Sequence, residues 1–588
     1  MDVEQESEFN VAELFKIFSQ KSQQIASIFL ESDMFRKKMD GRNIEHIIEA
    51  YQQFYSALML TPGVLSKAQI AYWQELLQLL GDVSKQWFSS ADEAHDKQHQ
   101  LIPDKRFTSE AWTSHPLFNF ISQSYLLLSK HTKQVIDDVD NVDHRTAKKI
   151  AFYTERTLDA LSPSNFLLTN PDVIEETIKT KGQNLISGLD NLLDDLTRAE
   201  KAFQIKMTDV DAFEVGRNVA TTPGNVIYQN ELMQLIQYTP QTTTVYQQPL
   251  LIIPPWINKF YILDLSEKNS FVRFCLAQGI AVYMISWVNP NESHREIDFS
   301  DYMKQGPLAA IDVICKQQSV KKVNTLGFCI GGTLQAATLA YMAKKNDLRV
   351  SSATYLASMI DFSDPGDMSI FIDDAQISHL EEEMNKKGYL DGSYMGGSFN
   401  LLRANDLIWS YYVKNYLKGE TPFPFDILFW NQDATNMPAK MHSTYLRKMY
   451  LENQLIEPDG IEVDGIGLDV GEIKTPVFFI STEKDHIAPW QTTYYGYLSH
   501  GGEKEFVLGE SGHIAGIINP PGKKKYGYYT NPTTQRRAST WLSKAQYNED
   551  SWWLHWSKWL SKHSGKKVKP KTKQPYPPLE AAPGSYVK

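Results

Sequence analysis

The first 200 residues carry apolar side chains at a spacing close to 3.6 residues, which is the period of an amphipathic helix. Polar and charged residues fill the positions between them. Six stretches follow this pattern: residues 9–31, 44–60, 68–87, 116–139, 146–161 and 173–203. Convincing strand alternation is absent here, so we expect a helical domain over residues 1–209. Its sequence leaves open whether the domain only supports the rest of the chain or also binds a partner or a surface.

The pattern changes after about residue 210. Short apolar runs rich in β-branched and aromatic residues recur at residues 249–255, 281–287, 323–328, 352–357 and 476–482. Helical stretches such as 270–278 and 333–344 separate them. Buried strands that alternate with helices are typical of a parallel sheet covered on both faces. We therefore expect an α/β catalytic domain over residues 210–588.

Two segments interrupt this alternation. Residues 361–472 contain helical and loop patterns rich in aromatic side chains, without a clear run of buried strands. An insertion of this length between strands is usually functional, and we expect a lid. Residues 565–588 begin with basic residues and continue with prolines, which favours a solvated, mobile tail.

Composition excludes several classes of protein. The formal net charge of −11 over 588 residues argues against a nucleic-acid-binding protein. Three cysteines far apart, with no CxxC pair, provide neither a disulfide framework nor a zinc site. No metal or redox cofactor is expected, because neither a GxGxxG after a strand nor an HExxH occurs.

The location follows from what the chain lacks. The first ten residues are acidic, unlike a signal peptide, and no run of 18 apolar residues predicts a transmembrane segment. A cytoplasmic protein is the default expectation.

The strongest local motif is LGFCIGG at residues 326–332. It follows an apolar strand and opens a helical stretch, which is the setting of a nucleophile elbow GxSxG, here with Cys329 at the serine position. Glycines two positions away leave room for the sharp turn. The turn aims the N–H of Ile330 at any oxyanion that forms beside Cys329, and the helix N-terminus favours a thiolate.

A nucleophile on this fold needs an acid and then a base further along the chain. Asp485 comes directly after the strand at residues 476–482, and His513 follows a short strand at residues 505–508 between two glycines. We expect Cys329, Asp485 and His513 to form a catalytic triad. Attack of a thiolate on a thioester is nearly balanced thiol exchange, so a cysteine favours acyl transfer from a thioester donor. The residues themselves leave hydrolysis open.

The chain resembles the poly(3-hydroxyalkanoate) synthases, and among them the class I enzymes, from about residue 100 onward. The motifs that carry the resemblance are DKRF at 104–107 with Trp112, SPSNF at 162–166, PPWINK at 254–259, GFCIGG at 327–332, WN at 430–431, DHI at 485–487, GHIAG at 512–516 and PGSYVK at 583–588. Residues 1–95 match the family only in helical character.

The resemblance implies an α/β-hydrolase fold with a lid insertion and a homodimer that works at the surface of polyester granules. It implies that (R)-3-hydroxyacyl-CoA of about three to five carbons is polymerised on Cys329, with CoA released and His513 as the base. Asp485 either orients His513 or helps to activate the 3-hydroxyl of the incoming monomer.

Further residues take their roles from the same resemblance. The N–H groups of Ile330 and Ile257 form the oxyanion hole, and Arg403 contacts CoA, with a charge pair to Asp406 as its alternative. Trp256 stands where some family members carry a smaller residue, so the pocket near this loop is expected to differ in shape.

The aromatic motif at residues 552–559 (WWLHWSKW) and the helical region are candidate contacts with the granule or with partner chains, and core packing is the alternative for this motif. Two other functions stay open. A thioesterase or polyester depolymerase would use the same triad, and a catalytically idle granule-coat protein would need none of it.

Overall fold

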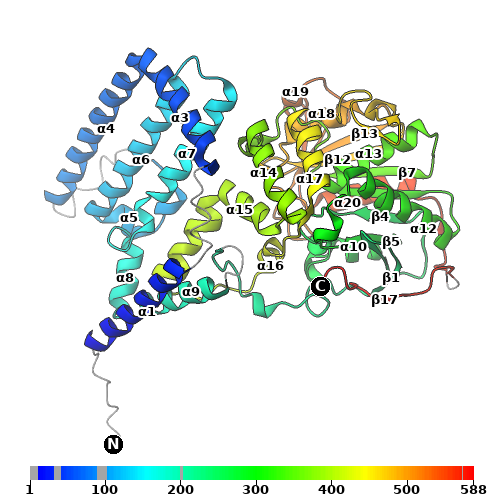
Figure 1. Cartoon of the computed structure of the whole chain (residues 1–588), viewed down its shortest axis with the longest axis horizontal. Coiled ribbons are helices and arrows are strands. Elements are labelled where there is room, and N and C mark those ends of the chain that lie inside the picture. Colours follow the sequence, from blue (N-terminus) through cyan, green and yellow to red (C-terminus); the bar gives the residue numbers. More distant parts are fainter. Residues whose placement is uncertain (1–10, 32–41, 89–101, 199–202, 572–573) are drawn as a thin grey trace, which may run out of the picture. The chain divides into compact units, whose positions relative to one another are not determined.

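The computed structural model describes residues 11–31, 42–88, 102–198, 203–571 and 574–588 (Figure 1). It divides into two compact units. The helical unit contains the described residues of 1–209 together with Gly397–Phe423, and the sheet unit contains Val210–Gly396 and Pro424–Lys588. Residues 397–423, which the sequence analysis placed in the lid of the catalytic domain, therefore pack with the helical unit instead.

The helical unit is built from amphipathic helices, drawn from blue to cyan in Figure 1. The described helices before residue 209 are α1 (Val11–Glu31), α3 (Arg42–Leu60), α4 (Pro62–Phe88), α5 (Glu110–Ser114), α6 (Pro116–Asp138), α7 (His144–Ala160), α8 (Pro171–Lys179) and α9 (Gln183–Arg198). The helix expected over 173–203 is two helices. Lys181 and Gly182 adopt positive φ angles of 53° and 87°, which end α8 and turn the chain into α9.

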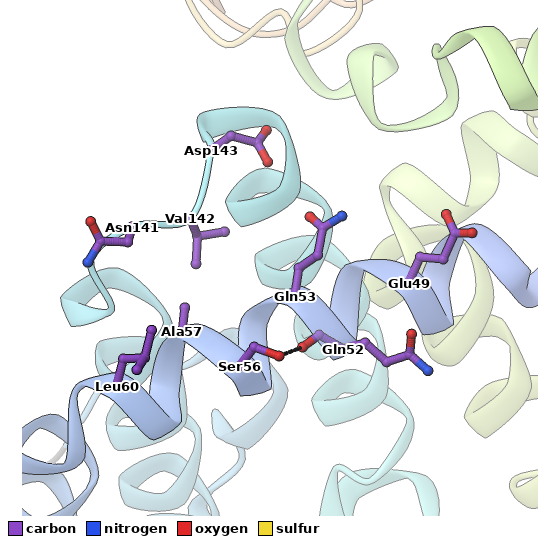
Figure 2. Close-up of a pocket in the computed structure, with 9 residues that line it drawn as sticks. All are labelled: Glu49, Gln52, Gln53, Ser56, Ala57, Leu60, Asn141, Val142 and Asp143. Atoms are coloured by element: carbon purple, nitrogen blue, oxygen red, sulfur yellow. Dashed lines mark hydrogen bonds between the residues drawn. The ribbon is translucent and has the colours of Figure 1, made fainter.

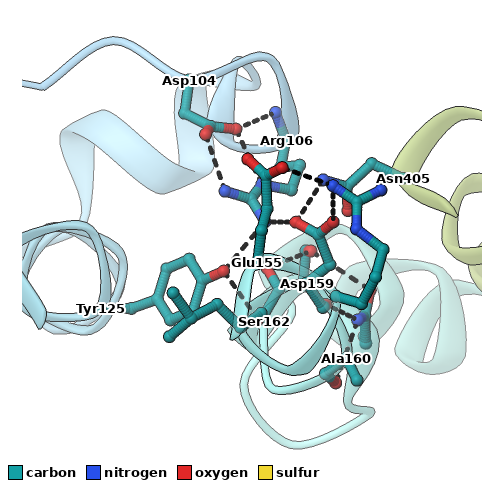
Figure 3. A network of polar contacts seen from close by, with 12 residues as sticks. Asp104, Arg106, Tyr125, Glu155, Asp159, Ala160, Ser162 and Asn405 are labelled. Carbon is teal, nitrogen blue, oxygen red and sulfur yellow. Dashed lines mark hydrogen bonds and ion pairs between the residues drawn. The ribbon is translucent and has the colours of Figure 1, made fainter. Parts of the chain in front are cut away.

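A partly buried polar network ties residues 397–423 to these helices (Figure 3). The Arg106 guanidinium donates to both oxygens of Asp104, to the Tyr125 hydroxyl at 2.9 Å and to Asp159 at 3.3 Å. Asn405 belongs to Gly397–Phe423, here called the returning segment, and donates to the same Asp159 carboxylate at 2.5 Å. Burial raises the pKa of Asp159 more than the facing Arg156 and Asn405 lower it. The DKRF motif thus has a structural role, because Asp104 and Arg106 belong to the network that holds residues 397–423 in the helical unit.

A second set of bonds fixes the far end of the returning segment. The Tyr416 hydroxyl donates to the buried Asp195 carboxylate at 2.7 Å. Asn184 of α9 donates to the Leu417 carbonyl at 2.8 Å. Both partners in the helical unit are buried, so the segment completes its core instead of lying on its surface.

The sheet unit contains an eleven-stranded mixed sheet in the order β15-β14-β13-β12-β7-β6-β4-β5-β2-β1-β17. Strands β4 (Leu250–Ile253), β5 (Val282–Trp287), β6 (Val323–Phe328), β7 (Val350–Leu356), β12 (Val477–Thr482) and β13 (Lys504–Gly509) form its parallel centre. All six residues of β6 are buried, as expected of a strand covered on both faces. These strands lie where the apolar runs predicted them.

Antiparallel strands extend this centre on both sides. They are β1 (Gly224–Gln229), β2 (Met233–Tyr238), β14 (Tyr528–Thr530), β15 (Gln546–Asn548) and β17 (Glu580–Ala581). The sheet order, with an antiparallel pair before the first parallel strand and a crossover from β4 to β5 and back to β6, is that of an α/β-hydrolase.

Helices fill the connections of the sheet unit. They are α10 (Phe271–Ala277), α11 (Phe299–Met303), α12 (Ala309–Gln318), α13 (Ile330–Lys344), α14 (Asp374–Lys387), α15 (Gly392–Leu402, which runs into the returning segment), α16 (Asp426–Gln432), α17 (Ala439–Thr444), α18 (Trp490–Ser499), α19 (Ala538–Ser543) and α20 (Trp552–His563). Helix α13 packs on β6 and begins where that strand ends. None of the described helices is long and apolar enough to cross a membrane.

The expectation of a mobile tail over 565–588 is wrong for the described residues. Strand β16 (Lys567–Val568) pairs with β3 (Val245–Tyr246), and β17 pairs with β1 at the edge of the large sheet. Val587 is 1% exposed. Backbone pairing and this buried side chain anchor a segment whose composition indicated solvation.

The aromatic motif at 552–559 lies in α20, and its tryptophans belong to the core. Trp552, Trp553, Trp556 and Trp559 are all buried. The indole N–H groups of Trp552 and Trp553 donate to the carbonyls of Gly516 and Ile517. These rings therefore support the loop that follows His513, and they are not a contact surface.

Candidate active site

The nucleophile elbow is present at the junction of β6 and α13. Cys329 has φ 53° and ψ −126°, a strained conformation for a residue with a Cβ atom. A Cβ on Gly331 would lie 2.2 Å from the Ile253 carbonyl oxygen, and one on Gly327 would lie 2.5 Å from the Gly332 Cα. The glycines are required because backbone occupies the space beside them. Cys329 is partly exposed, whereas Cys275 is fully buried.

Asp485 and His513 come from loops that follow the neighbouring strands β12 and β13. Oδ1 of Asp485 accepts the backbone N–H groups of Ile487 and Ala488, each at 2.9 Å. Its Oδ2 atom lies 2.6 Å from Nδ1 of His513. The ring of Phe328, directly before Cys329, stacks on the His513 ring with centroids 5.5 Å apart. The fold thus brings together the three residues that the sequence suggested.

The electrostatics of His513 fit an acid–base role. Burial disfavours the charged ring, but the charges of Asp485 and Cys329 and hydrogen bonds to both raise the pKa of His513 well above its ordinary value. The protonated ring of His513 is therefore stabilised where it lies, between Asp485 and Cys329.

The loop after β4 carries Ile257, and it lies against the first turn of α13. The contact is the one described at Gly331, whose Cα faces the carbonyls of Ile253 and Pro254. Thr435 fixes two successive peptide groups of the loop, because its hydroxyl donates to the Trp256 carbonyl and its N–H to the Ile257 carbonyl at 2.9 Å. In a trans peptide the N–H points opposite to the C=O, so the Ile257 N–H faces away from Thr435.

Trp256 does not shape an open pocket. Its side chain is 2% exposed and packs against Tyr302 and Trp287, with ring centroids 4.7 and 5.6 Å away. The large residue at this position fills the core beneath the loop.

Two tyrosines that sequence reasoning missed lie near Cys329. Tyr445 and Tyr450 belong to the π-helix η11 (Tyr445–Leu451), and their rings meet edge to face with centroids 5.3 Å apart. Burial raises the pKa of both hydroxyls, and the neighbouring Cys329 charge adds to this effect. The aromatic richness of the insertion was the only sequence signal for them.

Arg403 belongs to the helical unit. Its guanidinium contacts Asp406 at 2.7 Å, and Lys105 contacts the same carboxylate. The structure therefore contains the charge pair that was the alternative to a CoA contact, with the Arg403 side chain still half exposed.

A hollow of about 490 Å³ with a mixed polar and apolar lining opens in the helical unit, between α3 and the loop before α7 (Figure 2). Its lining includes Glu49 and Asp143, and its Ser56 hydroxyl is bonded to the Gln52 carbonyl of its own helix. Nothing in this lining is suited to acyl transfer. Among the described residues, no three His, Cys, Asp or Glu side chains gather in a way that could hold a metal ion.

Known families match both parts of the chain. Residues 103–275 match the family model "Poly-beta-hydroxybutyrate polymerase (PhaC) N-terminus", and residues 248–520 match the α/β-hydrolase fold. A monoacylglycerol lipase of Paleococcus ferrophilus, a solved structure, aligns over 48% of this chain and 90% of its own, at 13% identity and a TM-score of 0.31.

Curated relatives are similar over nearly the whole length. "Poly(3-hydroxyalkanoate) polymerase subunit PhaC" of Rhizobium meliloti is 43% identical over 87% of this chain and 84% of its own. The protein of the same name from Cupriavidus necator is 38% identical over 91% and 90%. With this similarity and the α/β-hydrolase fold, the chain belongs to the poly(3-hydroxyalkanoate) polymerases, a family of acyltransferases that synthesise polyester.

Proposed function

We propose that this chain polymerises (R)-3-hydroxyacyl-CoA through a covalent intermediate on Cys329 and releases CoA. The observation that carries the proposal is the contact of His513 with both Asp485 and Cys329, at the ends of strands β13, β12 and β6. Membership of the polymerase family supplies the substrate class.

The first half-reaction loads the enzyme. His513 takes the thiol proton, and the Cys329 thiolate attacks the thioester carbonyl carbon. The N–H groups of Ile330 and Ile257 donate to the oxyanion that forms. The bond from that carbon to the CoA sulfur then breaks, and the CoA thiolate takes the proton from His513.

The second half-reaction extends the chain. The 3-hydroxyl of another acyl group attacks the thioester on Cys329, its proton passes to His513, and the C–S bond to Cys329 breaks as the new ester forms. Asp485 holds His513 in the tautomer that presents Nε2 to the reacting atoms, and this role agrees with its bond to Nδ1. The alternative proposed role of Asp485 is to activate the 3-hydroxyl of the incoming monomer.

The monomer is short, with 3-hydroxybutyryl-CoA as the proposed substrate. Support comes from the matched family description, which names a polyhydroxybutyrate polymerase. Arg403 is proposed to bind the phosphates of CoA, and its ion pair with Asp406 would then break. Substitution Arg403→Ala should then raise KM for the acyl-CoA with little change in kcat.

The enzyme is further proposed to act as a homodimer at the granule surface. Support for surface association comes from α4, where Ile70, Trp73, Leu77 and Leu80 are each at least half exposed at helical spacing. Charged substitutions along this stripe should move the protein from sedimented polyester to the supernatant. Light scattering of the purified chain tests the dimer.

The test is CoA release from (R)-3-hydroxybutyryl-CoA, followed by thiol titration together with a check for insoluble ester. Wild-type protein should give both products, and Cys329→Ala should give neither. Free 3-hydroxybutyrate without polymer would replace the proposal by a thioesterase. A Cys329→Ala variant that still makes polymer would exclude this nucleophile.

A further inference from the structure

Lys259 is a largely buried cation in the loop that carries Ile257. Its ammonium group lies 3.0 Å from Oδ1 of Asp433 and donates to the Val587 carbonyl at 2.9 Å. The side chain is only 13% exposed. Three segments far apart in the chain therefore meet at one ammonium group: the loop after β4, the insertion and residue 587.

The carboxylate of Asp433 is held from its other side as well. Its Oδ2 atom accepts the Tyr261 hydroxyl at 2.7 Å. The burial of Tyr261 and the charge of Asp433 both raise the pKa of that hydroxyl, so it stays a donor. Asp433 is thus fixed by two groups from the same stretch, residues 259 and 261.

Backbone and side-chain bonds continue this contact along the loop. Asn258 forms a β-bridge with Ala434. Thr435 donates to the carbonyls of Trp256 and Ile257, as described above. The Trp430 indole N–H donates to the Lys259 carbonyl at 2.7 Å. Residues 256–259 are therefore paired side by side with residues 430–435.

We propose that Lys259 is a positioning residue for acyl transfer, because its contacts with Asp433 and Val587 hold the Ile257 N–H in the orientation that stabilises the oxyanion. The inference rests on the proposed function of Ile257. Oxyanion donors act through preorganisation, so a small displacement of the loop is costly. An ammonium group with a carboxylate and a carbonyl as acceptors provides that rigidity, since its removal leaves Asp433 without its cation.

The test compares two reactions of the same thiol. Acyl transfer passes through an oxyanion, whereas alkylation by iodoacetamide displaces iodide directly and forms none. Lys259→Met should lower kcat for CoA release by roughly 10- to 100-fold with KM within about twofold. The rate of Cys329 alkylation should stay that of the wild type, and Lys259→Arg should recover most of kcat.

The matched control is the exposed pair Lys304–Asp464, with an N–O distance of 2.7 Å. Lys304→Met should change neither reaction. Equal losses of acyl transfer and alkylation in Lys259→Met would mean general disruption of the site and would overturn the inference, as would an unchanged kcat. If wild-type protein releases CoA without forming polymer, the proposed polymerisation is wrong. The role of Lys259 is then still decided by the comparison of CoA release with alkylation in Lys259→Met.

Discussion

The two carboxylate oxygens of Asp485 have separate partners, and only one of them faces His513. Oδ1 accepts two backbone N–H groups of its own loop, while Oδ2 lies 2.6 Å from Nδ1 of His513. A carboxylate anchored in this way cannot rotate toward another group without losing those backbone bonds. The relationship favours a carboxylate that orients the imidazole over one that turns to a substrate hydroxyl.

The two roles of Asp485 predict different kinetics with an acyl-CoA that lacks the 3-hydroxyl. Under the proposed mechanism, butyryl-CoA should load Cys329 but provides no hydroxyl for chain growth. If Asp485 orients His513, Asp485→Asn slows the burst of CoA release by roughly 10³- to 10⁴-fold, because the imidazole takes the wrong tautomer. Rapid-quench measurement of the burst is the experiment. A normal burst combined with slow polymerisation would assign Asp485 to hydroxyl activation instead.

The elbow glycines predict a sharp contrast with a glycine elsewhere. A Cβ at residue 331 meets the Ile253 carbonyl oxygen, so Gly331→Ala should lower CoA release by about 100-fold or more as the loop after β4 is displaced. A Cβ atom on Gly81, in α4, would have no atom of the described residues beyond its own stretch of helix within 4 Å. Gly81→Ala should leave activity unchanged and stabilise its helix by about 1 kcal/mol. Equal activity of the two variants would contradict this account of the elbow.

The network around Arg106 predicts a large loss of stability in the helical unit. Arg106→Met leaves the buried Asp159 carboxylate with less compensation and should cost about 3 to 5 kcal/mol. The control is Arg217→Met, which removes an exposed partner of Glu214 and should cost less than about 1 kcal/mol. Thermal unfolding followed by circular dichroism measures both. A small effect at Arg106 would show that the network is replaceable by water.

His442 predicts sensitivity of the fold to acid. Neither ring nitrogen has a hydrogen-bond partner among the residues that the structure describes, and burial lowers the pKa of His442 to about 4. Between about pH 6.5 and 4 the unfolded chain binds a proton here that the folded chain does not. Stability therefore falls as pH falls through this window, by at most about 3 kcal/mol from this group.

Removal of the imidazole tests that window. His442→Leu should flatten the dependence of urea unfolding on pH between about pH 7 and about pH 4, relative to wild type. The same change at the exposed His144 should leave the wild-type slope. An unchanged slope in His442→Leu would assign the acid sensitivity to other groups.

Local pattern was sufficient for the parallel centre of the sheet and for the helices. The apolar runs became β4, β5, β6, β7 and β12 because a strand buried on both faces needs an apolar side chain at nearly every position. Strands β1 and β2 contain glutamine and tyrosine among their apolar residues, and the same criterion missed them.

Long-range backbone contacts explain the errors. Composition assigned residues 565–588 to solvent, but strand pairing depends on a partner strand more than 300 residues away in the case of β17 and β1. Similarly, no local feature of residues 397–423 predicts contacts with the helical unit. The hydrogen bonds from Asn405 to Asp159 and from Tyr416 to Asp195 depend on residues more than 200 positions away. The candidate site residues could be predicted from the sequence, because the elbow glycines mark Cys329 and the order of the chain then selects Asp485 and His513.

The discontinuity of the helical unit has a consequence for biosynthesis. Asp159 and Asp195 are made 246 and 221 residues before the side chains that complete their hydrogen bonds, so the ribosome adds all of Val210–Gly396 in between. Until residue 423 has emerged, the helices carry buried carboxylates with incomplete partners, a state open to chaperones and proteases. Residues 1–209 expressed alone would remain in that state permanently, and a self-sufficient helical fragment would have to bring Gly397–Phe423 with it.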